Sequence, residues 1–364
     1  MNITPKANIL KVKPYIPGKP IEDVKRELGL KRVIKLASNE NPYGPSPRVL
    51  KAISSAARSV NRYPDGACFY LRKELARQLK VNENQLIFGN GSDEIIVLAV
   101  RAYVGQGDEV IVAQPSFLIY EIASLLEGAC VRAVALKDFQ YDLVEMKRAI
   151  TAKTKIIFIG NPDNPAGTYI PRDALAQFVS QVRRDIVVFI DEAYFEYVHE
   201  KDYPDGIDLL KSNPNVIVTR TFSKMYGLAG LRVGYGVADS VIIDHLNRLR
   251  EPFNVNSLAQ AAAVACLKDK AYYRGISKSV EKQRAYLYKN FESLGIRYEQ
   301  SFTNFILLKV EQDSSVVAKA LLKKGIIIRD MNAWGLKNYI RVTIGSEQEN
   351  RILVKGLKEA LNKG

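Results

Sequence analysis

The chain has 364 residues, of which 47% are hydrophobic and 25% are charged, a balance typical of a globular protein with enough apolar material for two domains. No apolar run approaches the roughly 18 residues of a membrane span, and no apolar segment follows the first charges, so we expect neither a membrane anchor nor a secretory signal. The net charge is +14, but the basic residues are interleaved with acidic ones and no nucleic-acid motif accompanies them. This pattern disfavours nucleic-acid binding and favours an enzyme with anionic ligands.

Cysteines and histidines are few. Cys68, Cys130 and Cys266 are odd in number and far apart, a pattern typical of free thiols in a reducing compartment, so we expect a cytoplasmic protein. His199 and His245 are the only histidines, and no HExxH or CxxC motif occurs. The sequence therefore predicts no metal site.

Residues 1–35 are expected to form an N-terminal arm. Three prolines between residues 14 and 20 favour an extended strap there, and Tyr15 lies within it. The next segment, LASNENPYGPSP at residues 36–47, is rich in proline and glycine and is predicted to be a loop. After a helical stretch, a second turn with the sequence RYPDG contains Tyr63.

From residue 85 onward, short apolar segments alternate with helical ones. The predicted strands are QLIF, EVIVA, KIIFIG, DIVVFI and NVIVTRTF. Near-continuous apolar strands separated by helices predict a mostly parallel sheet with helices on both faces. Only about nine residues separate NVIVTRTF from RVGYGVA, and a parallel crossover needs about a dozen or more, so RVGYGVA is predicted to be an antiparallel strand.

The pattern changes after residue 251. Two long helices are predicted at about 257–273 and 275–294, then the strands NFILLKV, IIIR and YIRVTI, and a last helix that opens with a capping box at Ser346 and Glu349. These elements predict a second, smaller α/β domain. We therefore expect an arm over residues 1–35 that joins the small domain, a large cofactor-binding domain over 36–250 and the small domain over 251–364.

Ligands of such sheets gather at the carboxyl ends of the strands, and polar residues stand at several of these ends. After QLIF, the segment Gly89–Ser92 opens a helix whose N–H groups can bind a phosphate, although Ser92 or Asp93 can equally serve as a helix cap. This segment matches neither GxGxxG nor a P-loop. Phe117 follows EVIVA and is suited either to stack on a flat ring or to pack in the core.

Two further strand ends carry Asn164 and Asp191. Asn164 follows KIIFIG and is suited to bind a ligand or to form a turn with Pro165. Asp191 follows DIVVFI and puts a carboxylate at the end of an apolar strand, which requires a cation or donor in a ligand or in a nearby arginine. Tyr194 comes three residues later.

The segment TFSKMYGLAGLRVGY, residues 221–235, follows the last parallel strand. Lys224 stands just past that strand among glycines that let the backbone approach a ligand, so it is a candidate Schiff-base lysine. Ser223 and Arg232 are suited to a phosphate. Together with the other strand ends, they describe a ligand with a flat ring, a basic nitrogen, a phenolic oxygen, an aldehyde and a phosphate, which is pyridoxal 5'-phosphate.

Over nearly its whole length the chain resembles the fold type I pyridoxal-phosphate aminotransferases, through the motifs NENPYGPSP, RYPDG, GNGSDE, NPDNPAGT, DEAYFEY, TFSKMYGLAGLRVGY, PFNVNSLAQAAA and IRVTIG. Within that family it is most similar to the histidinol-phosphate aminotransferases, on NENPYGPSP, RYPDG and the arm sequence PYIPGKP. It departs from the family at Asp163 and Ala166, where NPNNPTG is more common, and at Phe117, where tyrosine is frequent.

The resemblance implies roles for the residues at the strand ends. It makes Lys224 the Schiff-base lysine and proton carrier, and it pairs Asp191 with the ring nitrogen. Tyr194 joins them in the catalytic group and donates to the ring oxygen. The remaining cofactor contacts implied within one chain are Ser92, Asp93, Phe117, Asn164, Ser223 and Arg232.

The resemblance also implies an anion site and a dimer. Arg341 in YIRVTI and Arg329 in IIIRD would bind the substrate anion, and Tyr15 would close over it. Tyr63 would reach the cofactor phosphate of the other subunit of a homodimer. The partners implied are thus small anionic substrates and a second copy of the chain.

Alternative functions stay open on the sequence. The resemblance implies transamination of L-histidinol phosphate with 2-oxoglutarate, in histidine biosynthesis. An aromatic-amino-acid aminotransferase or a threonine-phosphate decarboxylase on the same scaffold is the alternative, and release of carbon dioxide would identify the decarboxylase. A non-enzymatic cofactor binder is disfavoured, because no DNA-binding segment is appended and no chemical group is missing.

Overall fold

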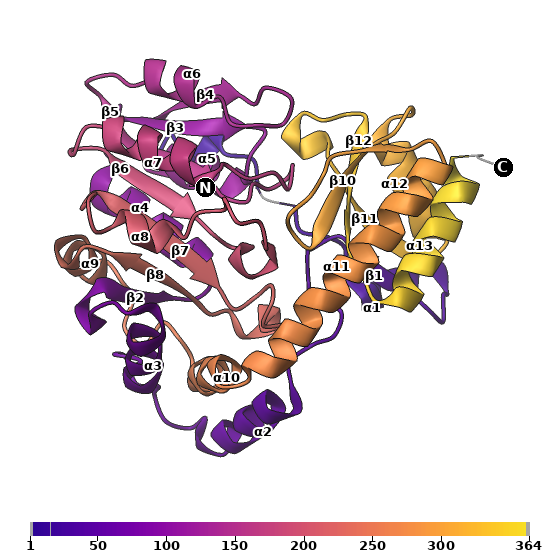
Figure 1. The fold of residues 1–364 in the computed structure, drawn as a ribbon, viewed down its shortest axis with the longest axis horizontal. Coiled ribbons are helices and arrows are strands. Elements are labelled where there is room, and N and C mark those ends of the chain that lie inside the picture. The colour runs from indigo at the N-terminus through magenta and orange to yellow at the C-terminus, as the bar shows by residue number, and fades with distance from the viewer. Residues whose placement is uncertain (1–2, 15, 362–364) are drawn as a thin grey trace.

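The computed structural model describes residues 3–14 and 16–361, and within them the chain forms two β-sheets that lie side by side (Figure 1). The larger sheet has seven strands in the spatial order β2 (Leu86–Gly89), β8 (Gly234–Ala238), β7 (Val216–Thr221), β6 (Val187–Asp191), β5 (Thr154–Gly160), β3 (Glu109–Gln114) and β4 (Cys130–Ala135). The smaller sheet has five, in the order β1 (Ile34–Leu36), β11 (Ile326–Asp330), β12 (Tyr339–Thr343), β10 (Phe305–Lys309) and β9 (Arg297–Tyr298).

Neighbouring strands of the larger sheet run parallel except at β8, which is antiparallel to both β2 and β7. The prediction of one antiparallel strand at RVGYGVA is therefore confirmed. The edge strand β4 was not predicted from the sequence. Its side chains are mostly exposed, so it lacks the apolar run that marks the central strands.

Helices bury both faces of the larger sheet. One face packs against α4 (Ser92–Tyr103), α5 (Leu118–Leu126) and α9 (Ser240–Asn247). The other packs against α6 (Leu143–Arg148), α7 (Arg172–Gln181) and α8 (Gly206–Leu209). Side chains of the central strands alternate between these two cores, so every residue of β6 and β7 is buried. Polar side chains at the ends of these strands are thus removed from bulk water.

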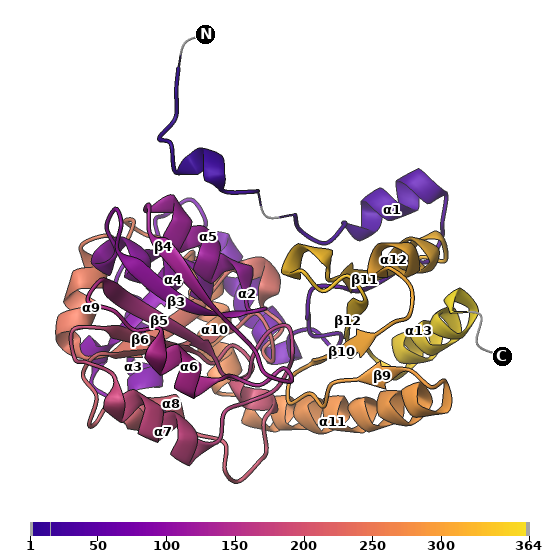
Figure 2. The ribbon, with the colours of Figure 1, turned by 90° about the horizontal axis from the view of Figure 1, so that it is seen from above.

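The smaller sheet joins the two ends of the chain. Strand β1 pairs in parallel with β11, while β12 is antiparallel to both β11 and β10. Its helices are α11 (Lys270–Ser293), α12 (Ser314–Lys323), α13 (Glu347–Ala360) and α1 (Ile21–Leu28), of which α1 lies beside α12 (Figure 2). The predicted capping box at Ser346 and Glu349 is confirmed as the start of α13.

The boundary between the two long helices was predicted wrongly. Helix α10 (Ser257–Leu267) ends earlier than expected, and α11 runs through Gly275, which was expected to lie at the break. A glycine inside a helix costs about 1 kcal/mol. Tyr273 and Ile276 are buried on the same turn, and their burial offsets that cost.

The N-terminal arm crosses from the larger unit toward the smaller one (Figure 2). Near its start, the side-chain amide of Asn8 donates to the carbonyl of Leu126 at 2.5 Å, and α1 begins directly after Pro20. Tyr15 lies outside the described residues. The predicted domain boundaries at residues 35 and 250 stay a prediction. The remaining helices are α2 (Pro47–Ala56), α3 (Phe69–Leu79), and the 3-10 turns η1 (Ile9–Lys11), η2 (Ala57–Ser59), η3 (Glu83–Gln85), η4 (Phe195–Tyr197), η5 (Ala229–Leu231) and η6 (Asn332–Trp334).

None of the helices in the described segments is both long and apolar enough to cross a lipid bilayer.

Candidate active site

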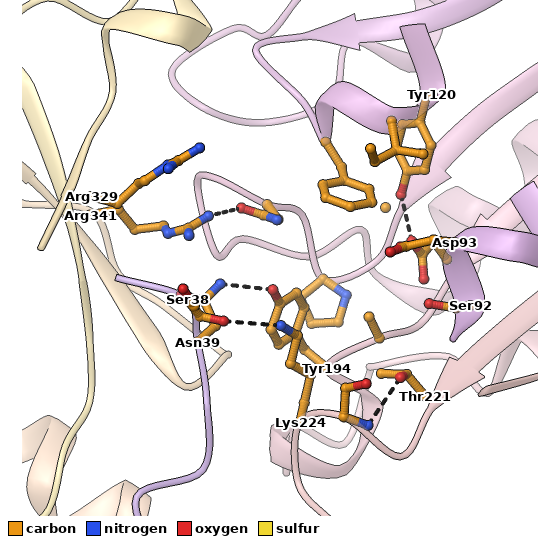
Figure 3. A pocket seen from close by; sticks show the side chains of 18 of the residues that line it. Ser38, Asn39, Ser92, Asp93, Tyr120, Tyr194, Thr221, Lys224, Arg329 and Arg341 are labelled. Carbon is orange, nitrogen blue, oxygen red and sulfur yellow. Dashed lines mark hydrogen bonds between the residues drawn. The ribbon is translucent and has the colours of Figure 1, made fainter. Parts of the chain in front are cut away.

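A cavity of about 260 Å³ lies between the two sheets, at the carboxyl ends of β5, β6 and β7 (Figure 3). It is lined by residues from both sheets and from the arm: Gly18, Ala37, Ser38, Asn39, Ser92, Asp93, Phe117, Ile119, Tyr120, Gly160, Pro162, Asn164, Asp191, Ala193, Tyr194, Thr221, Ser223, Lys224, Arg232, Arg329, Trp334 and Arg341. Of the predicted site residues that the structure describes, all except Tyr63 are in this set.

One end of the cavity is suited to an anion. Helix α4 begins at Ser92, so its first N–H groups and the positive end of its dipole face the cavity. The Arg232 guanidinium donates to the Ser223 hydroxyl at 3.4 Å and lies 3.4 Å from the Asp93 carboxylate. Gly91 has φ +86°, and a Cβ there would lie 2.4 Å from the guanidinium. The positive φ, which L side chains rarely adopt, favours glycine at this position.

Asp191 lies on the buried floor of the cavity. Its carboxylate accepts from the Tyr120 hydroxyl at 2.8 Å and from the Thr219 hydroxyl at 3.2 Å, both of which are neutral donors. Burial raises the pKa of Asp191 to about 6, and the Tyr120 hydrogen bond opposes this increase. A bound cation would complement this carboxylate. Tyr120 was not singled out in the sequence, because it is an apolar-face position of α5.

Lys224 enters the cavity just beyond β7. Its ammonium donates to the carbonyl of Ser38 at 3.3 Å and lies 5.9 Å from the centre of the Tyr194 ring (Figure 3). Burial, and then the positive charge of Arg341, lower the pKa of Lys224 to about 8. About a tenth of the amine is therefore neutral at pH 7 and able to act as a nucleophile, far more than for an ordinary lysine.

Asn39 is a site residue that the sequence did not reveal. Its side-chain amide donates to the Tyr194 hydroxyl at 2.9 Å, and its backbone N–H donates to the Thr343 hydroxyl at 2.9 Å. It is 1% exposed and has φ +55°, a left-handed conformation that asparagine tolerates better than most residues. Asn39 therefore connects the larger sheet to β12. The available signal was its position in the proline-rich NENPYGPSP loop, which did not distinguish it from its neighbours.

The opposite end of the cavity carries two arginines. Arg329 on β11 and Arg341 on β12 project side by side from the small sheet (Figure 3). Arg341 donates to the side-chain carbonyl of Asn164 and to the carbonyl of Ala37, the latter at 3.1 Å. Arg329 donates to the carbonyl of Ile16 in the arm at 2.8 Å. This end is a second site suited to an anion.

Phe117 lies in the cavity, whereas Tyr63 lies on the exposed surface. Phe117 lines the cavity and contacts Tyr120 edge-on, with ring centroids 5.5 Å apart. Tyr63 does not line the cavity of its own chain. It is 83% exposed and stacks on Phe253 at a centroid distance of 4.8 Å.

The profile of one family, aminotransferase class I and II, matches residues 31–357 of this chain. The chain belongs to that family and is an aminotransferase with the fold type I architecture that the sequence predicted. Among its relatives, the histidinol-phosphate aminotransferase of Moorella thermoacetica is 48% identical, over 97% of this chain and 92% of the relative. That of Caldicellulosiruptor saccharolyticus is 46% identical, over 96% of this chain and 98% of the relative.

A solved structure gives the same result for the fold. The crystal structure of histidinol-phosphate aminotransferase from Sinorhizobium meliloti in complex with pyridoxal-5'-phosphate has a TM-score of 0.91 and 28% sequence identity, covering 98% of this chain and 97% of that chain. The cavity here has the groups that such a ligand requires. They are a helix N-terminus with Arg232 for the phosphate, the buried Asp191 carboxylate for a protonated ring nitrogen, and the Lys224 amine for the aldehyde.

Proposed function

We propose that this chain is a pyridoxal-phosphate-dependent aminotransferase that converts L-histidinol phosphate, with 2-oxoglutarate as amino acceptor, in histidine biosynthesis. The observation that carries the proposal is a cavity with an anion site at each end and a lysine between them. One site is suited to the phosphate of the cofactor, and the other to an anionic group of each substrate. Relatives that are 48% and 46% identical and named histidinol-phosphate aminotransferases support this choice of substrate.

The phosphate end of the cavity would fix the position of the cofactor. The N–H groups of Ser92 and Asp93 and the Ser223 hydroxyl would donate to the phosphate oxygens, while Arg232 adds a positive charge. Asp191 would hold a proton on the ring nitrogen, because a negative charge close by favours the protonated form. When bound, pyridoxal phosphate supplies the electrophilic carbonyl and the electron-accepting ring that the reaction needs.

Lys224 and Tyr194 handle protons on the other side of the cavity. The lowered pKa of Lys224, about 8, would make its amine a nucleophile for an aldehyde and a carrier of the proton at the substrate carbon. Burial raises the pKa of Tyr194 to about 12, so its phenol stays protonated. Because Asn39 already donates to the Tyr194 oxygen, the phenolic proton is available for the ring oxygen of the cofactor. Asn164 supports the same region through its contact with Arg341.

Arg329 and Arg341 supply the preference for anionic substrates. Guanidinium groups bind carboxylate and phosphate alike through paired N–H donors, so the same site can hold histidinol phosphate and then 2-oxoglutarate. An aromatic-amino-acid aminotransferase would also use one arginine for a carboxylate. The second arginine at the same end of the cavity favours the more highly charged phosphate ester.

We propose a homodimer in which Tyr63 contacts the cofactor phosphate in the other subunit. Tyr63 stacks on the Phe253 ring and Phe69 contacts Tyr70 edge-on, and exposed aromatic pairs of this kind are typical of a protein interface. We also propose a cytoplasmic location. It is supported by three free cysteines, since free thiols are typical of a reducing compartment.

A substrate panel tests the proposal. Purified holoenzyme is assayed with 2-oxoglutarate and, in turn, histidinol phosphate, phenylalanine, tyrosine and aspartate as amino donor, with Lys224→Ala as the background control. Histidinol phosphate is expected to have the highest kcat/KM. A higher kcat/KM for an aromatic amino acid would replace the proposal with an aromatic aminotransferase. Release of carbon dioxide from threonine phosphate would replace it with a decarboxylase.

A further inference from the structure

Trp334 is the only tryptophan in the chain. It lies in η6, directly after β11, and lines the cavity although it is only 6% exposed. It packs with Leu307 and Met331 in a small apolar cluster of its own. A large aromatic residue in this position has both a packing surface and a face that is available to the site.

The first observation concerns the two arginines. Arg329 and Arg341 are directly opposite each other on the antiparallel strands β11 and β12. Like charges in that arrangement repel each other. The indole ring lies close to both, with its centroid 5.0 Å from the guanidinium carbon of Arg329 and 5.9 Å from that of Arg341. One aromatic ring therefore attracts both cations and offsets part of their repulsion.

The second observation concerns the link between the sheets. The indole N–H of Trp334 donates to the carbonyl of Ser116 at 2.9 Å. Ser116 belongs to the loop that follows β3, and the next residue, Phe117, lines the cavity at the cofactor end. A single side chain thus contacts the arginine pair of the small sheet and the loop of the large sheet that carries Phe117.

We propose that Trp334 is a positioning residue that sets the spacing of the Arg329 and Arg341 guanidinium groups and holds them in register with the cofactor end of the site. The ligand that this pair then selects is a dianionic group, such as a phosphate monoester. The proposal rests on the proposed function, because it assigns the arginine pair to the substrate anion. Trp334 itself does not touch the reacting atoms and acts through the two arginines.

The main experiment compares two donors that differ in the anion alone. Histidinol phosphate and histidinol are assayed with wild-type holoenzyme, with Trp334→Leu, which lacks the aromatic face, and with Trp334→Phe, which retains a face but lacks the N–H. In Trp334→Leu the ratio of the two kcat/KM values is expected to fall at least 10-fold, mainly through KM for histidinol phosphate. Trp334→Phe is expected to retain most of that ratio. Equal losses for both donors would mean that Trp334 is merely structural and would overturn the proposal.

Tyr339→Leu provides the matched control. Tyr339 packs against the same apolar cluster but does not line the cavity, so its loss tests the effect of weaker packing alone. The donor ratio should stay at the wild-type value in this variant. If Tyr339→Leu lowers the ratio as much as Trp334→Leu does, the effect comes from the cluster and the proposal is wrong.

Fluorescence keeps the proposal testable if Trp334→Leu does not fold. Since Trp334 is the only tryptophan, its emission in wild-type holoenzyme reports on the arginine pair directly. Titration with inorganic phosphate should change that emission, and Arg329→Gln should reduce the change. An emission that does not respond to saturating phosphate would overturn the proposal. This measurement does not require turnover of histidinol phosphate, so it separates failure of this proposal from failure of the proposed function.

Discussion

At the scale of single residues, Asp191 combines deep burial with donors that carry no charge. We expect Asp191→Asn to slow the single-turnover conversion of the bound cofactor by donor amine at least 100-fold, because an amide does not favour a protonated ring nitrogen. Cofactor uptake should fall much less, since the phosphate contacts at Ser92 and Arg232 are intact. Stopped-flow absorbance measures the first quantity and equilibrium titration the second. Near-normal single-turnover rates in the variant would mean that Asp191 has a structural role alone.

Asp163 is a second buried carboxylate with neutral neighbours. It accepts from the Tyr141 hydroxyl at 3.1 Å, from the Ser116 hydroxyl at 3.5 Å and from the backbone N–H of Ala166 at 3.1 Å. Burial raises its pKa from 3.8 to about 7, and these hydrogen bonds oppose the increase. The folded state therefore binds this proton more tightly than the unfolded state does. Ionisation of Asp163 destabilises the fold progressively as the pH rises from about 4 to 7.

The prediction concerns Asp163→Asn, which removes that ionisation. Relative to wild type, the variant should gain about 3 kcal/mol more in free energy of unfolding at pH 8 than at pH 5, because the pH rises by about two units between pH 5 and the folded-state pKa and each unit corresponds to about 1.4 kcal/mol. Urea unfolding at the two pH values measures the difference. Tyr141→Phe is the control, since it removes a hydrogen-bond donor and leaves the carboxylate. A stability difference between Asp163→Asn and wild type that does not change with pH would contradict the assignment.

At the scale of elements, the ends of β6 and β7 are tied together by a buried ion network. Arg220 on β7 donates to Glu192 at 2.7 Å and to Asp205, which caps α8, at 2.6 Å. Its guanidinium also lies 3.4 Å from the centre of the Phe195 ring. Burial raises the pKa of Glu192 to about 7 even though Arg220 opposes that shift. The network holds the two strand ends that carry Asp191 and Lys224 in a fixed relation.

We expect Arg220→Leu to lower the free energy of unfolding by about 3–5 kcal/mol at pH 8, because it leaves Glu192 buried without its cation. The double variant Arg220→Leu with Glu192→Gln should lose less than the single one. A thermodynamic cycle from urea unfolding of the wild type, the two single variants and the double variant measures the coupling. Additive losses across that cycle would show that the two side chains do not depend on each other.

The elements that could be predicted from the sequence are those whose pattern is local. The central strands are apolar throughout, the short connection before β8 dictates its direction, and Ser346 with Glu349 marks the start of α13. Strand β4 could not be predicted, because an exposed edge strand lacks the apolar pattern. The strand-end residues of the site follow from the topology of a parallel sheet. Asn39 and Trp334 enter it through contacts 304 and 218 residues away in sequence, which local patterns do not record.

At the scale of the whole molecule, Tyr63 and Lys224 of one chain lie in different environments, the first on the exposed surface and the second in the cavity. We predict that a heterodimer of Lys224→Ala and Tyr63→Ala chains recovers a sizeable fraction of wild-type activity. If Tyr63 serves the active site of the other subunit, one active site of this heterodimer carries both substitutions and the other carries neither. Two affinity tags allow purification of the heterodimer, and turnover per site is then measured.

The matched control puts both substitutions in one chain and pairs it with a wild-type chain. In a shared-site dimer, each site of this heterodimer has one defect, so activity should be low. If Tyr63 acts within its own chain, the two results are exchanged: the control heterodimer keeps one intact site and the heterodimer of single variants keeps none. Activity in the control heterodimer, together with no activity in the heterodimer of single variants, would contradict the shared site.

The bond from the Asn39 backbone to Thr343 spans 304 residues. During translation at about 5–20 residues per second, Asn39 is added to the chain roughly 15–60 s before Thr343 is. The larger sheet is complete in sequence by residue 238, so it can assemble while β1 still has no neighbour. The cavity is lined both by residues near Asn39, which are made early, and by residues near Thr343, which are made late. Each newly made molecule thus acquires its site only after synthesis has almost finished, and nascent or prematurely terminated chains do not have it.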